Sequence, residues 1–479
     1  MDDYLKAARL NSKRKYLKET FDYLTDIGKP KKFKSSSNYP PIDKIDFLIE
    51  KGQRCFNFKA ASLNLVSNIV QYQNHNYGFA KPFSVRNDEF YWTNPIGVAS
   101  LTMLMNEDLK SEGEIWHIES SFNISEKKHF RLVIPKTHNP LKDHHQFIQS
   151  ESFNVEESLK FAGLSEFQCN QNLFHLFDYN NNQNGNDYFL FIDSMTSIKY
   201  DEFEKYIGAI SYSLGIITGE VLRNEMYILQ SSNNDFKVIS GFQYRRIEDS
   251  ISSGMEVVSP HLLWEITKSN SQDGYINLEV FSNIVNKARE DKRFLRALKI
   301  ISEANEYPLE IRASAYSVAL ETVKNIVLEE NSEKINPFKD RKFAAKIIKS
   351  LKDIIIPIEA SFFNNKETVI NKLEQINQVT NKDSFKIAFD LCGFTLTDID
   401  EKALLKRNDF LHGRIPFEDE EEANQNQELK FITYKLHFLV TALIMKYCKF
   451  SGLLKNNPKF FSVFAEDNKE IDEPLFRKT

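Results

Sequence analysis

The sequence predicts an α+β protein, with a mixed, strand-rich N-terminal part followed by an all-α helical bundle. Up to about Gly274, short segments alternate apolar and polar residues between turn-forming residues, a pattern typical of strands. Beyond Gly274, apolar residues recur at spacings of three and four, as in helices that bury one face. We therefore expect a mixed domain over residues 1–274, a helical domain over residues 275–465 and a C-terminal tail over residues 466–479.

The first part should contain at least five strands and one long helix. The Asn-rich residues 180–186 predict a hairpin or loop. Apolar residues at helical spacing predict a helix that starts near Asp201 and ends at Gly219. The alternating segments that we interpret as strands are residues 114–119, 130–134, 188–192, 226–229 and 236–239.

The second part should consist of helices only. The clearest apolar stripe runs from Leu309 to Val327 and predicts a helix that packs along its whole length. Thr397 and Asp400 form a capping signal for a later helix that should run to His412. Other helices are expected over residues 277–288, 290–304, 343–354, stopped by Pro357, and 429–447, closed by Gly452.

Composition indicates an ordinary globular chain of 479 residues, with 41% hydrophobic and 27% charged residues. The formal charge of −5 means that any contact with nucleic acid depends on a local basic patch. Four dispersed cysteines suggest neither a disulfide framework nor a zinc motif. We find no signal peptide and no apolar run of membrane-spanning length, so we expect a cytoplasmic protein without membrane contact.

A short motif near the C-terminal end carries the chemistry of RNA cleavage. Arg407 is followed directly by Asn408, and His412 comes five positions after the arginine. RNA supplies its own nucleophile, the 2′-hydroxyl, so a protein needs only a proton-transfer group and a cation for the crowded phosphate. His412 suits the first task and Arg407 the second, while Asn408 could orient the imidazole or hold a phosphate oxygen. Lys402, Lys406 and Arg414 surround the motif and could hold flanking RNA phosphates.

The motif also has a plain structural interpretation. Arg407 could form a surface ion pair and His412 could end a helix before Gly413. Glu321 could orient the motif arginine or could simply pair with Lys324 on its own helix.

Other polar clusters carry weaker signals. His138, Asp143, His144 and His145 contain metal-ligand residue types, but their spacing matches no familiar metal motif, so we expect a solvated loop and no metal. The acidic residues 418–422 are expected to be a solvated helix start. Short basic clusters near Tyr16 and Phe33 could bind nucleic acid, with these aromatic rings stacking on bases, or could be merely solvated.

The helical part resembles the HEPN superfamily of ribonucleases, in particular the ApeA-like branch of bacterial anti-phage defence. The resemblance covers residues 275–450, and the N-terminal part is similar to the mixed domain of that branch through the strand at Phe191 and Ile192 and the helix from Asp201 to Gly219. The phrases that carry it are Arg312-Ala313-Ser314-Ala315-Tyr316 with Ala319-Leu320-Glu321, Leu391-Cys392-Gly393-Phe394, and Leu404-Leu405-Lys406-Arg407-Asn408-Asp409-Phe410-Leu411-His412-Gly413.

The resemblance implies a metal-independent endoribonuclease that acts on tRNA or mRNA as a toxin in abortive infection, with Arg407, Asn408 and His412 as catalytic residues and no cofactor. It further implies a homodimer through the helical domain, with two motifs facing one cleft. The N-terminal domain would be a regulatory or sensor domain that meets a phage-derived trigger. The alternative is a non-catalytic HEPN-like module that binds nucleotides or protein partners.

Overall fold

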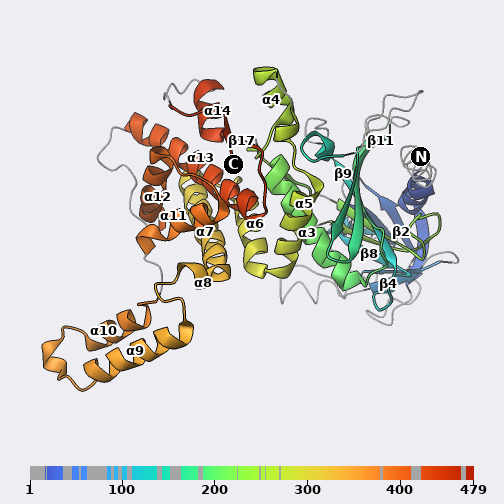
Figure 1. Ribbon diagram of the computed structural model, residues 1–479. Coiled ribbons are helices and arrows are strands. Elements are labelled where there is room, and N and C mark those ends of the chain that lie inside the picture. The colour runs from blue at the N-terminus through green and yellow to red at the C-terminus, as the bar shows by residue number, and fades with distance from the viewer. Residues whose placement is uncertain are drawn as a thin grey trace. The chain divides into compact units, whose positions relative to one another are not determined.

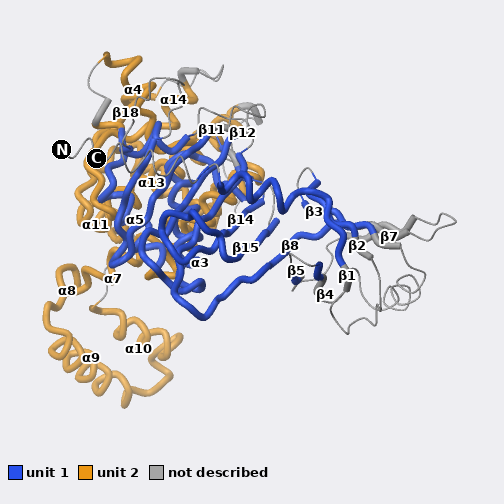
Figure 2. Tube along the Cα trace, turned by 90° about the vertical axis from the view of Figure 1, so that its right-hand side faces the viewer, with its two compact units in different colours: residues 1–254, 275–289 blue, residues 255–274, 290–479 orange. Residues whose placement is uncertain are grey.

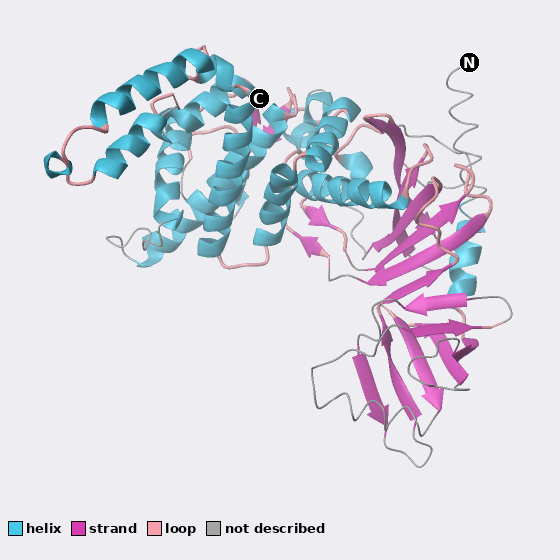
Figure 3. Ribbon diagram, turned by 90° about the horizontal axis from the view of Figure 1, so that it is seen from below, coloured by secondary structure: helices cyan, strands magenta, loops and turns pink. Residues whose placement is uncertain are grey.

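The chain folds into two compact units that exchange segments (Figure 2). The first unit consists of residues 1–254 and 275–289, and the second of residues 255–274 and 290–479. This computed structural model describes residues 17, 19–35, 46–52, 55–61, 83–87, 91–94, 100–104, 110–136, 143–150, 163–181, 187–223, 225–246, 250–253, 255–268, 271–377, 381–411, 422–464 and 471–479. The strands gather mainly in the first unit and the helices in the second (Figure 3), so the α+β prediction is confirmed.

A 14-stranded sheet forms the first unit, in the order β10-β11-β12-β9-β14-β15-β8-β5-β4-β1-β2-β3-β7-β6. All of these neighbours pair antiparallel, as in the register of Leu132 with Ile192 of β12 on one side and Ile228 of β14 on the other. The strands are β1 (Lys31–Ser35), β2 (Asp46–Lys51), β3 (Phe56–Ala61), β4 (Phe83–Arg86), β5 (Tyr91–Asn94), β6 (Ser100–Leu104), β7 (Lys110–Ile115), β8 (His117–Ser120), β9 (His129–Lys136), β10 (Leu164–Cys169), β11 (Asn172–Asn181), β12 (Asp187–Ser194), β14 (Glu225–Ser231) and β15 (Ile239–Arg246). A separate pair joins β13 (Glu220–Val221) to β16 (Ile251–Ser252).

Aromatic side chains attach helices to the sheet. In helix α3 (Tyr200–Thr218) the ring of Phe203 stacks on Phe130 of β9, with centroids 5.2 Å apart. Helix α5 (Leu278–Glu290) places Phe281 against Phe167 of β10, with centroids 4.9 Å apart. Because α5 packs on the sheet, residues 275–289 belong to the first unit and not to the helical domain that we expected to begin at residue 275.

In the first unit, the strands and the helix predicted from periodic segments are mostly present. The strands at 130–134, 188–192 and 226–229 and the helix that ends at Gly219 are confirmed, and Gly219 adopts a left-handed φ of 71°. The strand expected at 236–239 is wrong, because the chain turns at Phe236, whose φ is 56°, and β15 starts only at Ile239. Trp116 divides the segment 114–119 between β7 and β8. Of the Asn-rich segment, residues 182–186 lie outside the described residues, but β11 and β12 on either side pair antiparallel.

Helix α7 (Leu309–Glu330) is the centre of the second unit (Figure 1) and packs against α6, α11, α12 and α13. The predicted stripe is buried, with Ala313, Tyr316 and Leu320 fully covered. The helices of this unit are α4 (Pro260–Thr267), α6 (Lys292–Ala304), α7, α8 (Ser332–Ile335), α9 (Arg341–Ile355), α10 (Lys366–Glu374), α11 (Asn381–Cys392), α12 (Asp398–Leu411), α13 (Glu422–Tyr447) and α14 (Asn457–Phe464). None of the helices that the structure describes has both the length and the apolar character needed to cross a membrane.

The end of the chain differs from the expectation. Strands do not stop at Gly274, because β17 (Leu453–Lys455) pairs with β18 (Phe476–Lys478). Helix α13 ends at Tyr447, where Lys449 takes a left-handed φ of 70°, and not at Gly452. The expected tail therefore ends in a strand of the second unit.

Candidate functional site

Helix α12 carries the sequence motif, and the predicted capping signal fixes its start. The Thr397 hydroxyl oxygen accepts a hydrogen bond from the Asp400 backbone N–H at 3.2 Å, and Asp400 Oδ2 accepts one from the Thr397 N–H at 2.9 Å. These reciprocal bonds satisfy two of the amide groups that a helix start leaves free. The motif helix therefore begins where the sequence predicts.

A buried charge network, consisting of Asp400, Lys435, Glu473 and Arg477, ties this helix start to α13 and to the chain end. The ammonium group of Lys435 lies 2.7 Å from Asp400 Oδ1 and 2.7 Å from Glu473 Oε2. Arg477 Nη2 lies 2.9 Å from Asp400 Oδ2. Burial opposes ionisation of Asp400, but Arg477 and Lys435 outweigh it and hold the pKa of its carboxyl below the usual range. The network holds two positive and two negative charges, so it is neutral.

Arg407 lies on the packed side of α12 and not on its solvent side. Its guanidinium carbon sits 3.9 Å from the ring centroid of Phe385 on α11, which is a cation–π contact. Its Nη1 lies 3.3 Å from Glu321 Oε2 on α7, and its Nη2 donates a 2.8 Å hydrogen bond to Asn408 Oδ1. Its Nε is buried and has no hydrogen-bond partner among the described residues.

In the part of the chain that the structure describes, the contacts around Arg407 hold more positive than negative charge. Lys324 on α7 is also buried, 3.0 Å from Glu321 and 4.6 Å from the ring centroid of Phe385. One carboxylate thus serves two cations. Burial lowers the pKa of Arg407 while Glu321 raises it, and a guanidinium remains charged under either influence. A net positive charge at a buried arginine with an unpartnered N–H favours the binding of an anion.

The structure brings together only some of the predicted site residues. Arg407 and Asn408 are hydrogen-bonded, and Asn408 is exposed. Lys402 and Lys406 lie on the exposed side of α12, away from the packed side that holds Arg407. His412 and Arg414 lie outside the described residues, and α12 ends at Leu411, directly before His412.

Two of the neighbours of Arg407 could not be predicted from the sequence. Phe385 comes from α11, and neither the motif nor its spacing points to it. The sequence indicates Lys324 only as a partner of Glu321 on the same helix. For Glu321 the two open alternatives both hold, since this carboxylate contacts Lys324 and Arg407. The one feature of the sequence that could have indicated Phe385 is that it is an aromatic residue near the start of α11.

Two predictions about the N-terminal part need correction. The stretch with His144 is not a solvated loop, because His144 starts the short helix η2 (His144–Gln146) and is 2% exposed. Phe33 is 1% exposed within the hydrophobic core, so it cannot stack on bases. His138 and Tyr16 lie outside the described residues.

By its architecture, the protein combines a unit built on a large antiparallel sheet with packed helices and a unit built as a helical bundle. We compared the chain with models of protein families, with curated proteins and with solved structures, and none of the three comparisons gave a match.

Proposed function

We propose that this protein is a metal-independent endoribonuclease of the HEPN type, and that its helical unit cleaves tRNA or mRNA. The observation that carries the proposal is the environment of Arg407. Its guanidinium lies in a buried cluster where two cations share one carboxylate, its Nε has no hydrogen-bond partner among the described residues, and it comes five positions before His412, the residue after the helix. A phosphate is the anion that such an arrangement suits.

The chemistry follows from these groups. The 2′-hydroxyl of the RNA loses its proton and its oxygen attacks the adjacent phosphorus, and the bond from phosphorus to the 5′-oxygen breaks. One His412 accepts the proton of the 2′-hydroxyl, a second proton-transfer group donates a proton to the departing 5′-oxygen, and Arg407 stabilises the additional negative charge on the phosphate. Asn408, by accepting a bond from Nη2, fixes the guanidinium and leaves its own amide group to contact the phosphate. The products carry a 2′,3′-cyclic phosphate and a 5′-hydroxyl.

Two chains would supply the second proton-transfer group. Exposed apolar side chains on α12, which carries Arg407, and on α7, which packs against it, support a homodimer through this unit, namely Leu405 on α12 and Ile311 and Val318 on α7. The apolar stripe of α13 gives no such support, because residues such as Leu436 and Leu443 are buried within the unit.

The biological setting belongs to the same proposal. A ribonuclease of this kind needs control in its own cell, and we assign that control to the strand-rich unit, which would respond to a phage-derived trigger in the cytoplasm. The protein would then act as a toxin of abortive infection.

One observation favours the alternative, a non-catalytic module that binds nucleotides or protein partners. Arg407 is only 8% exposed and is already engaged by Phe385, Glu321 and Asn408, as an arginine with a purely structural role would be.

The deciding experiment compares RNA cleavage by the purified wild type, Arg407→Ala and His412→Ala. Each substitution should reduce the rate by a factor of about 100 or more, because it removes charge stabilisation or proton transfer. His261→Ala is the matched control, since this histidine is on α4 of the same unit and its side chain is 81% exposed. Wild-type rates in either motif variant would show that the motif does not carry the cleavage, and a wild type that cleaves no RNA would favour the non-catalytic alternative.

A further inference from the structure

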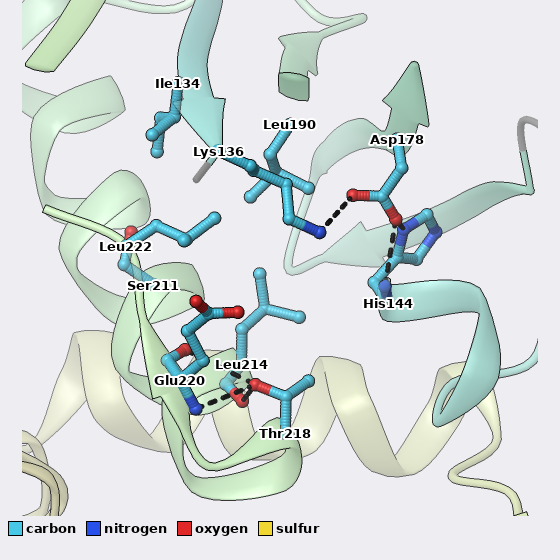
Figure 4. A pocket seen from close by; sticks show the side chains of 10 residues that line it. All are labelled: Ile134, Lys136, His144, Asp178, Leu190, Ser211, Leu214, Thr218, Glu220 and Leu222. Carbon is cyan, nitrogen blue, oxygen red and sulfur yellow. Dashed lines mark hydrogen bonds and ion pairs between the residues drawn. The ribbon is translucent and has the colours of Figure 1, made fainter. Parts of the chain in front are cut away.

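A buried group of ionisable side chains lies at one end of the sheet in the first unit (Figure 4). His144 and His145 come from η2, and Asp178 comes from β11. One potential ligand atom from each of the three residues lies within 4.8 Å of the other two. An adjoining small cavity, with room for about one water molecule, is lined by Lys136 of β9 and by Thr218 and Glu220.

Asp178 is the centre of this group. Its Oδ1 lies 3.2 Å from Lys136 Nζ, and its Oδ2 accepts a 2.9 Å hydrogen bond from the His144 backbone N–H. The Nδ1 atoms of both histidines also approach Oδ2, that of His145 to 3.9 Å. Burial opposes ionisation of Asp178, but Lys136 and His144 hold the pKa of its carboxyl well below the usual range. This side chain is therefore a carboxylate at neutral pH.

Ion pairs within the protein explain the contacts of Asp178 with Lys136 but do not explain the buried nitrogen atoms of the two histidines. Lys136 lies between Asp143, at 2.6 Å, and Asp178, so its charge is matched. With both imidazoles neutral, the second carboxylate leaves one negative charge that a bound cation would balance, and Glu220 lines the adjoining cavity. On the other side, His145 Nδ1 and His144 Nε2 are buried without hydrogen-bond partners among the described residues. A cation beside Asp178 Oδ2 would offset the charge and engage imidazole nitrogen.

We propose that His144, His145 and Asp178 bind one divalent transition-metal ion of the zinc class, with the remaining position open to water. Two imidazoles and one carboxylate are a ligand set that suits zinc and related metals, and three protein ligands leave such an ion one free site. The hydrogen bond from the His144 backbone and the contact with Lys136 fix the orientation of the carboxylate, as outer partners of metal ligands do. The ion would fasten η2 to β11.

The test uses the full-length, tag-free protein, stripped with a chelator and then dialysed. Zn²⁺ is titrated by calorimetry, and the retained metal is measured by elemental analysis. We expect one ion per chain in the wild type and at least a tenfold weaker affinity in His145→Ala and Asp178→Asn. Zn²⁺ should also raise the melting temperature of the wild type and not that of His145→Ala.

His175→Ala is the matched control for the loss of a buried histidine. His175 is on the same strand as Asp178, is 3% exposed and pairs with Glu166 instead of the proposed site. This variant should bind Zn²⁺ like the wild type. If Asp178→Asn does not fold, His145→Ala decides, because its side chain is 23% exposed and its loss removes no ion pair of Lys136. A wild type that binds Zn²⁺ no better than His145→Ala would overturn the proposal and leave an internal ion network.

Discussion

Lys435→Met tests whether the buried charge network holds the motif helix in place. Lys435 is fully buried, and its ammonium group contacts Asp400 and Glu473, both at 2.7 Å. Methionine has a similar length and packs well in an apolar space, so the substitution removes mainly the charge. Arg477 would then face two buried carboxylates alone, and the network would carry one net negative charge.

The expected loss is large for a single substitution. Breaking a buried ion pair by removing one partner costs about 3–5 kcal/mol, because the other partner stays buried without its counter-charge. For a unit of this size each kcal/mol corresponds to about 2–4 °C, so the melting temperature should fall by about 6–20 °C. Differential scanning calorimetry of the full-length protein at neutral pH measures this.

Two further variants and the pH dependence make the result decisive. Lys446→Met, on the same helix but partly exposed, should cost less than about 1 kcal/mol. Adding Glu473→Gln to Lys435→Met should recover part of the loss, because it restores neutrality.

Because the pKa of Asp400 is depressed on folding, the contribution of its carboxylate to stability is present above its ordinary pKa of 3.8 and disappears as the pH falls below it. A melting temperature for Lys435→Met within 2 °C of that of Lys446→Met would refute the reasoning.

Three other predictions concern the proposed ribonuclease. Cleavage should leave 2′,3′-cyclic phosphate ends, detectable by end-specific ligation, and should spare DNA. Cleavage should also continue in EDTA. His145→Ala, which lacks the proposed metal site, separates an effect of chelation on that site from an effect on cleavage. Loss of activity in EDTA by both the wild type and His145→Ala would contradict the mechanism. Replacing Lys402 and Lys406 by alanine should reduce the salt dependence of RNA binding, with a slope smaller by about 1.4 for single strands, and an unchanged slope would exclude them as phosphate contacts. Light scattering over a dilution series, with activity measured in parallel, should show a dimer that loses activity as it dissociates, whereas a fully active monomer would rule out a shared site.

Much of the local structure could be predicted because the information lies within single segments. The apolar stripe from Leu309 to Val327 and the capping pair of Thr397 and Asp400 each specify a helix without reference to the rest of the chain. The order of the strands could not be predicted in this way, since β9 pairs with β12 and β14 and not with a neighbour along the chain.

The same distinction, between information within one segment and contacts made by the fold, applies to the residues of the candidate site. Arg407, Asn408 and His412 could be proposed as a motif because they are close in sequence, and Glu321 could be proposed beside them because it lies on a recognisable helix. Phe385, which makes the cation–π contact with the Arg407 guanidinium, reaches it through the packing of α11, which no periodicity in one segment encodes. In the proposed metal site, too, Asp178 joins the two histidines only because the fold brings β11 next to η2.

The exchange of segments between the two units sets an order for their completion during synthesis. The first unit has all its residues once residue 289 has left the ribosome. The second unit already has residues 255–274 by then, but Val257 accepts its hydrogen bond from the Lys455 N–H, and β17 pairs with β18 at the very end of the chain. The strand-rich unit can therefore fold while the helical unit is still incomplete. A chain cut short before β18 would therefore carry a finished first unit attached to a bundle in which β17 has no partner strand.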